Sequence, residues 1–104
     1  MEDIRIDVGV DTILEVDLSE MVFDGIEAII FTVKNMPNIE CDPIIERKFT
    51  TAEIHKIKIT AEESIKLTER AQYDFQKLLT DGTRIKMTDN GNVRLRWSVG
   101  DKFD

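Results

Sequence analysis

No catalytic motif stands out in the sequence. The single histidine, His55, has no serine placed beside it by a local motif, and no nucleophile-elbow pattern occurs. The single cysteine, Cys41, lies between Glu40 and Asp42, and these carboxylates disfavour the thiolate form that reacts. We therefore expect no catalytic residue and predict that the protein is not an enzyme.

Acidic residues near the start of the chain could instead bind a metal ion. They are Asp7, Asp11, Glu15 and Asp17. Ca²⁺ takes roughly six to eight oxygen ligands, and the spacing of these acids matches no EF-hand. Three of them alternate with apolar residues, as the outward-facing residues of strands do. A single cysteine also excludes a thiolate zinc site, and no glycine-rich phosphate loop occurs. We expect no metal and no cofactor.

Small and aromatic residues alternate with polar ones in residues 69–76, ERAQYDFQ. Glu69, Ala71, Tyr73 and Phe75 follow the order acid, small residue, tyrosine and core residue that surrounds a tyrosine corner in immunoglobulin-like sandwiches. In such a corner the ring is buried between two sheets and the hydroxyl bonds to upstream backbone. We predict that Tyr73 and Phe75 form this structural tyrosine corner in the core.

An aromatic platform for a sugar is the other interpretation of these rings. Trp97 belongs to an alternating run, residues 93–99, whose phase places its ring in the core as well. Asp74 is expected to point outward, where Arg94 and Arg96 of a neighbouring strand could pair with it. The charge of Asp74 is then explained without catalysis.

Apolar residues alternate with polar ones along most of the chain. This period of two predicts strands with one buried and one solvated face, and it covers residues 4–8, 14–18, 57–59 and 93–99. Residues 26–34 are apolar on both faces at their middle, as in a central strand. Residues 44–49 begin just after a proline, which suits an edge strand. Asp-Gly and Asn-Gly pairs mark turns between the runs.

One segment has helical signals. Residues 60–63, TAEE, form a capping box in which Thr60 and Glu63 can satisfy each other's backbone amides. We expect one short helical crossover near residues 61–67. The short strands at regular spacing predict an all-β fold, an antiparallel immunoglobulin-like β-sandwich of about 7–8 strands, with residues 1–104 as a single domain. A small barrel is the main alternative.

A narrower resemblance covers most of the chain. It is carried by residues 29–34 (IIFTVK), 57–67 (IKITAEESIKL) and 73–76 (YDFQ), by the Asp81-Gly82 pair, by Gly91 and by residues 93–100. This order resembles the immunoglobulin-like domains of baseplate and tail structural proteins of phages and prophages, such as the N-terminal domain of baseplate upper proteins.

The resemblance implies a non-enzymatic structural or assembly module of a phage or prophage tail or baseplate, acting through protein–protein contacts. Its partners would be other virion or tail proteins or further copies of itself, in a virion or in the bacterial cytoplasm. We choose residues 35–49 as the contact surface, because Met36, Ile39 and Ile44 are expected to be exposed and edge strands readily add another strand. A carbohydrate-binding β-sandwich module is the alternative function.

Charge and hydropathy argue against other classes of partner. The formal net charge of -7 works against binding nucleic acid, which depends on neutralising phosphates with Lys and Arg. The start of the chain lacks the basic and apolar regions of a signal peptide. The longest apolar run is far shorter than the ~20 residues that span a bilayer. We expect neither a nucleic acid nor a membrane partner.

Overall fold

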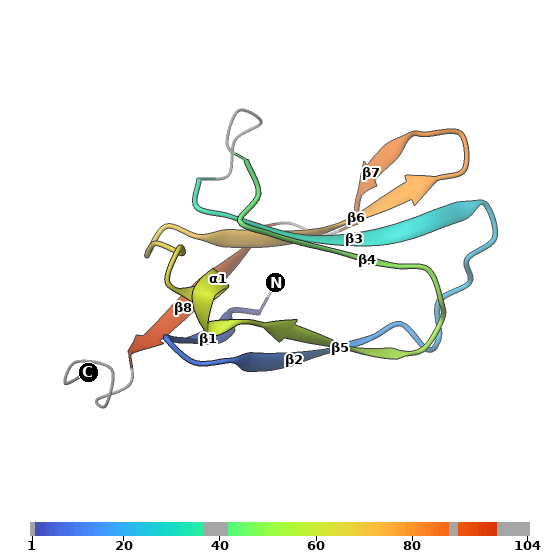
Figure 1. Cartoon of the computed structure of the whole chain (residues 1–104). Coiled ribbons are helices and arrows are strands. Elements are labelled where there is room, and N and C mark those ends of the chain that lie inside the picture. The colour runs from blue at the N-terminus through green and yellow to red at the C-terminus, as the bar shows by residue number, and fades with distance from the viewer. Residues whose placement is uncertain (1, 37–41, 88–89, 98–104) are drawn as a thin grey trace.

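The computed structural model describes residues 2–36, 42–87 and 90–97, without the side chain of Trp97 (Figure 1). Most of these residues lie in strands. The elements in chain order are β1 (Ile4–Val8), β2 (Thr12–Asp17), β3 (Ile26–Lys34), β4 (Ile45–Phe49), β5 (Ile54–Ile59), α1 (Ala61–Ser64), β6 (Gln72–Leu79), β7 (Arg84–Lys86) and β8 (Gly91–Trp97). The predictions of an all-β fold and of one short helical crossover are confirmed.

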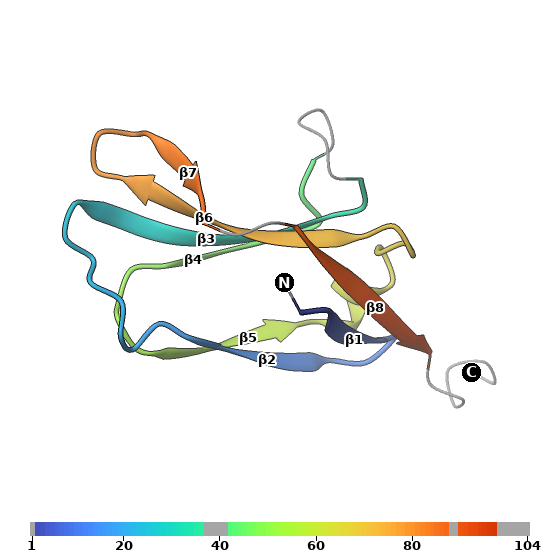
Figure 2. The same cartoon turned by 180° about the vertical axis from the view of Figure 1, so that it is seen from behind.

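The strands form two sheets that face each other as the layers of a sandwich (Figure 1, Figure 2). The larger sheet has the order β1-β8-β6-β3-β4, with β7 also paired to β6, and the smaller sheet consists of β2 and β5. In immunoglobulin terms, β2 and β5 correspond to strands B and E, and β3, β6 and β8 to strands C, F and G. The predicted β-sandwich is confirmed.

The central strand of the larger sheet is β3. Phe31 and its neighbours two residues away point into the core, while Ile30 and Thr32 on the opposite face are also buried. β4 and β6 pair with the two edges of β3, so neither edge of this strand is free. The predicted central strand at residues 26–34 is therefore present. The predicted edge strand is present as well, since β4 ends the order of the sheet.

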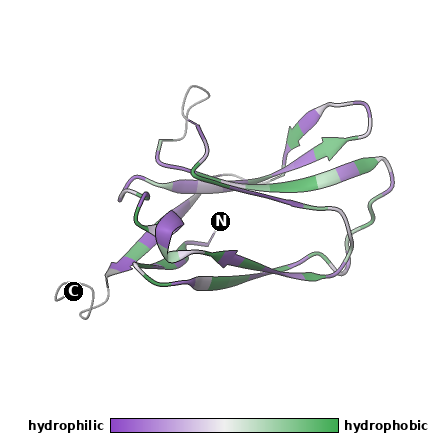
Figure 3. Cartoon of the chain, viewed as in Figure 1, coloured by the Kyte–Doolittle hydropathy of each residue, from purple (hydrophilic) through white to green (hydrophobic). Residues whose placement is uncertain are grey.

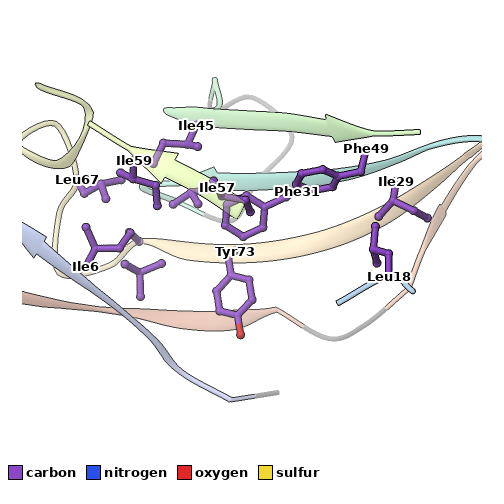
Figure 4. Packing of buried hydrophobic residues seen from close by; sticks show 13 residues of the cluster. Ile6, Leu18, Ile29, Phe31, Ile45, Phe49, Ile57, Ile59, Leu67 and Tyr73 are labelled. Carbon is purple, nitrogen blue, oxygen red and sulfur yellow. The ribbon is translucent and has the colours of Figure 1, made fainter. Parts of the chain in front are cut away.

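One hydrophobic core fills the space between the sheets (Figure 4). Its fully buried side chains include Ile6, Ile29, Phe31, Ile45, Ile57 and Ile59. Figure 3 shows hydrophobic residues interrupted by hydrophilic ones along the strands, as the alternation requires. Burying one such side chain contributes roughly 1.5–3 kcal/mol relative to leaving it exposed. The core therefore stabilises the fold far more than the single turn of α1 can.

The first strand lies parallel to the last one. The register places Ile4 opposite Val93 and Val8 opposite Trp97. Between β1 and β2 the chain turns at Gly9, whose φ of 86° lies in the left-handed region that glycine favours. An antiparallel sandwich was expected, and this one pair departs from it. Parallel pairing needs a long crossover, and here the whole domain lies between the two strands.

Ion pairs join the outer faces of β1 and β8. Nε of Arg94 lies 2.8 Å from Oδ2 of Asp3, and Nε of Arg96 lies 2.7 Å from Oδ1 of Asp7. The expected pairing of these arginines with Asp74 is wrong. The reason is that β8 pairs with β6 only at Gln72 and Tyr73 and then continues along β1.

The capping box of α1 is formed as the sequence predicts. The amide of Glu63 donates to the Thr60 hydroxyl at 3.1 Å, and the amide of Thr60 donates to the Glu63 carboxylate at 3.1 Å. A second contact holds the helix to the sandwich, because the hydroxyl of the buried Ser64 accepts a hydrogen bond of 2.9 Å from the amide of Gly9. The crossover is thus fixed both locally and to the turn after β1.

Gly91 begins β8 directly opposite Tyr73 of β6. A Cβ atom at residue 91 would lie 2.4 Å from Cε1 of the Tyr73 ring and 2.8 Å from its hydroxyl oxygen. These distances are shorter than van der Waals contact between such atoms. The ring therefore requires a residue without a side chain at this position.

Replacing Gly91 with alanine should lower the free energy of unfolding by about 1–3 kcal/mol, because the added methyl group displaces the Tyr73 ring. Urea denaturation of the variant and the parent measures this loss. Asn92→Ala, at the exposed next residue, is the control and should change the free energy of unfolding by less than about 0.5 kcal/mol. Equal stability of Gly91→Ala and the parent would contradict the close approach.

Candidate functional site

Tyr73 attaches the start of the chain to the larger sheet. Its ring is buried, and its hydroxyl donates a hydrogen bond to the backbone carbonyl of Glu2. Figure 4 shows the hydroxyl pointing away from the other core side chains. Burial raises the pKa of Tyr73, and the charges of Glu2 and Asp3 raise it further. The phenol therefore stays protonated and remains a donor.

The acceptor of this bond differs from that of a tyrosine corner. In immunoglobulin domains the hydroxyl bonds to backbone a few residues upstream of the tyrosine. Here the ring lies between the sheets, but the segment leading into β1 crosses its outer edge and supplies the carbonyl. Tyr73 consequently joins the start of the chain to β6, whereas a corner bond would have closed the crossover before β6.

Phe75 packs with Tyr73 and Phe31 in a cluster of three rings. The ring centroids of Phe31 and Phe75 are 5.2 Å apart, and those of Phe31 and Tyr73 are 5.9 Å apart. Each aromatic side chain that the structure describes is buried or half-buried. The described rings therefore form no open platform. The expected core position of the Trp97 ring lies outside the described residues.

The predicted contact residues differ in their exposure to solvent. Met36 is 48% exposed, as a contact residue should be. Ile44 is half-buried and packs against the core, because its amide bonds to the carbonyl of Val33 and holds it beside β3. Ile39 and Cys41 lie outside the described residues.

Arg47 connects β4 with β5 and α1 on one flank of the sandwich. Its guanidinium donates to both oxygens of Glu63, at 2.8 and 3.0 Å, and to the carbonyl of Lys58 at 3.2 Å. One side chain thus links the edge of the larger sheet to the last strand of the smaller sheet and to α1. The sequence showed Glu63 as a capping residue, but no local signal pointed to Arg47.

The smaller sheet presents exposed apolar residues to solvent. On its outer face Ile13 is 62% exposed and Ile54 is 56% exposed. Between them Glu15 lies directly opposite Lys56 in the register of β2 and β5. Neither β2 nor β5 pairs with any other described strand. This sheet therefore has two edges that carry no neighbouring strand within the described residues.

A polar hollow of ≈ 300 Å³ lies on the outer face of the larger sheet. Thr32 lines it, and on either side stand Glu46 of β4 and Asp74 and Gln76 of β6, with Arg84 of β7 beyond them. Thr32 is only 9% exposed, and its hydroxyl has no hydrogen-bond partner among the described residues. Buried hydroxyls usually have a hydrogen-bond partner. The Thr32 hydroxyl is therefore available to donate to, or accept from, a small polar molecule that enters the hollow.

The residues considered for catalysis or metal binding are scattered. Nε2 of His55 lies 2.8 Å from the carbonyl of Thr51, and its ring packs on Phe49. Asp11 binds the amide of Ala61 and the ammonium group of Lys58. No group of three or more His, Cys, Asp or Glu residues able to hold a metal occurs among the described residues.

The sequence matches no protein-family model and no curated protein. Within the described part of the chain no helix is long and apolar enough to cross a membrane. The function is therefore inferred from the surface geometry of the chain.

Replacing Tyr73 with phenylalanine should lower the free energy of unfolding by about 1 kcal/mol or more, because it leaves the Glu2 carbonyl without its donor. Chemical denaturation measures the change. In the same variant the amides of Ile4 and Ile6 should exchange with solvent faster than in the parent. Phe75→Tyr, which adds a hydroxyl two residues away, is the control and should leave the exchange of β1 unchanged. Unaltered exchange in Tyr73→Phe would show that the hydroxyl does not hold the first strand.

The Glu63 carboxylate should make stability depend on pH. Burial alone would raise the pKa of Glu63, but the hydrogen bond from the Thr60 amide and the Arg47 guanidinium hold it below its ordinary value. A lowered pKa in the folded state stabilises the fold above the ordinary carboxyl range, and this stabilisation is lost as the pH falls through the folded-state pKa.

We therefore expect Glu63→Gln to be less stable than the parent at pH 7, with a difference that shrinks as the pH is lowered below the ordinary carboxyl range. Urea denaturation at a series of pH values measures it. Glu62→Gln, at the exposed neighbouring residue, should show no such trend. A difference between Glu63→Gln and the parent that stays constant down to pH 3 would contradict the role of the carboxylate.

Proposed function

We propose that the chain is a non-enzymatic assembly module that binds other proteins through the edges of its sheets. The observation that carries this proposal is the set of strand edges without a neighbour: β4 ends the larger sheet, and β2 and β5 pair only with each other among the described strands. Such edges present unpaired backbone N–H and C=O groups, which is how many domains bind an extended segment of another protein.

Exposed apolar side chains lie beside these edges. Ile13 is on β2, Ile54 is on β5, and Met36 follows β3 close to the beginning of β4. Single exposed apolar residues are normal on protein surfaces. Their position next to unpaired strands supports binding, because an added strand would cover the side chain and the backbone together.

For the biological setting we propose the tail or baseplate of a phage or prophage. Support comes from the resemblance of residues 29–34, 57–67 and 73–76 to the immunoglobulin-like domains of such proteins. A tail is built from many copies of a few proteins, so a rigid sandwich with several contact edges suits that task. The partners would be other tail proteins or further copies of the chain.

A carbohydrate-binding module is the second candidate. The polar hollow favours it, because Thr32, Asp74 and Gln76 are residues that can hydrogen-bond sugar hydroxyls. The buried aromatic rings count against it, since sugar platforms need exposed rings. We therefore place protein binding first.

The proposal predicts that the gene lies among tail genes and that mass spectrometry finds the chain in purified particles from the same bacterium. Purified protein should associate with a tail protein encoded nearby, as measured by light scattering of the mixture over a concentration series. A tail protein from an unrelated phage is the control and should leave the scattering unchanged.

Adding glycans to the isotope-labelled chain separates the two candidates. Assembly predicts no shift of the amide signals of Thr32, Asp74 and Gln76, whereas saturable shifts of these signals would favour the sugar-binding function. A gene far from virion genes, absence from particles and no association with any tail protein would together overturn the assembly proposal.

A further inference from the structure

The free edge of β2 presents backbone groups that are ready to pair. In an antiparallel pair, alternate residues direct their N–H and C=O groups toward the partner strand, and the residues between them direct these groups away. The amide of Leu18 bonds to the carbonyl of Glu53, which continues the register of β2 with β5. Since every second residue before Leu18 pairs in the same way, the even-numbered residues of β2 direct their backbone groups toward β5. Ile13, Glu15 and Asp17 therefore direct their backbone groups away from β5.

An apolar hollow of ≈ 230 Å³ lies directly inside this edge. Leu14 and Val16 of β2 form one side of it, and Phe31, Tyr73 and Phe75 of the larger sheet form the other. Leu14, Val16 and Phe75 are only half-buried, so water reaches the core side of β2 here. Ile4 of β1 also lines the hollow, but β1 pairs with β8 in the larger sheet and leaves the edge of β2 unpaired.

The outer side of the same edge is acidic. Glu15 and Asp17 alternate with the apolar residues of β2 and face solvent, and Ile13 stands beside them. Glu15 makes no ion pair or side-chain hydrogen bond among the described residues. The carboxylate of Asp17 accepts from the amide and hydroxyl of Ser19, which lowers its pKa and keeps it charged.

We propose that β2 accepts a β-strand from a protein partner in which apolar and basic residues alternate. The apolar side chains of that strand enter the hollow against Leu14, Val16 and Phe75. Its Lys and Arg side chains lie on the outer face beside Glu15 and Asp17, and its backbone pairs with Ile13, Glu15 and Asp17. This inference rests on the proposed protein-binding function and names the edge and the chemistry of the partner.

The other edges suit this strand less well. On β5 the carbonyl of Lys58 is already bonded to Arg47, and the outward residues Lys56 and Lys58 would repel a basic strand. A second copy of the chain is a poor donor as well. Its described strands that alternate apolar and basic residues are β5, β7 and β8. All three are already paired within the sandwich, and β7 has only three residues.

The test is a titration of the isotope-labelled chain with a peptide of about nine residues in which Val and Ile alternate with Lys and Arg. The amides of Ile13, Glu15 and Asp17 should shift and should exchange with solvent at least about tenfold more slowly when the peptide is bound. A peptide with Glu in place of every Lys and Arg should bind at least about tenfold more weakly.

Matched variants test the edge itself. Glu15→Lys should weaken binding of the basic peptide by about tenfold, whereas Glu46→Lys, the same charge change on the edge strand β4, should leave it unchanged. Glu15→Pro removes an N–H that the sandwich does not use and should abolish binding, with the fold checked by circular dichroism. If Glu15→Pro fails to fold, Glu15→Lys still decides the matter.

The proposal is overturned if the basic peptide does not bind, or if it shifts the amides of β4 or of the polar hollow instead of those of β2. Protection of the β2 amides that grows with the concentration of the chain alone would name a second copy as the occupant and would also overturn it. A chain that is found in virions but does not bind the peptide would lose this site and keep its assembly role. If the chain binds the peptide but is absent from virions, the β2 site stands and the proposed role in a tail is overturned.

Discussion

The pairing of β3 with β6 is the interaction on which the rest of the structure depends. It brings Phe31 opposite Phe75 and Val33 opposite Tyr73, so three aromatic side chains of the larger sheet meet in one place. The smaller sheet packs onto this surface through Ile57 and its neighbours. Because protein interiors are close-packed, the position of these rings then limits where every other strand can lie.

The first strand, β1, is held in the larger sheet by contacts with Tyr73 and with β8. The Tyr73 hydroxyl reaches the carbonyl of Glu2, and Arg94 and Arg96 hold the outer face of β1 to β8. These contacts retain the first strand in the larger sheet. The smaller sheet is left with two strands and an uncovered flank at β2. The same bonds that secure the start of the chain therefore leave a strand edge open for a partner.

The contacts that join the two sheets and the edge proposed to bind a partner thus lie on opposite flanks of the sandwich. On the flank of β4 and β5, Arg47 and Glu63 connect the two sheets and the helix. On the flank of β2 no comparable side chain bridges the gap among the described residues, and the core is partly open to water. One closed and one open flank would suit the proposed assembly role, because a strand added at β2 would leave the contacts of Arg47 in place.

The sequence by itself determined most of the strands, the central position of residues 26–34 and the capping box, because periodicity and capping depend on near neighbours. It predicted no strand at β7, which has only three residues. It also placed Tyr73 and Phe75 on one face of a strand. Only the tertiary structure decided that the Tyr73 hydroxyl bonds to Glu2, that Arg94 and Arg96 pair with Asp3 and Asp7, and that Arg47 reaches Glu63. The open edge of β2 was equally hidden, since it results from β1 pairing with a strand at the other end of the chain. Such contacts depend on which strands become neighbours, and alternation along the chain carries no information on that choice.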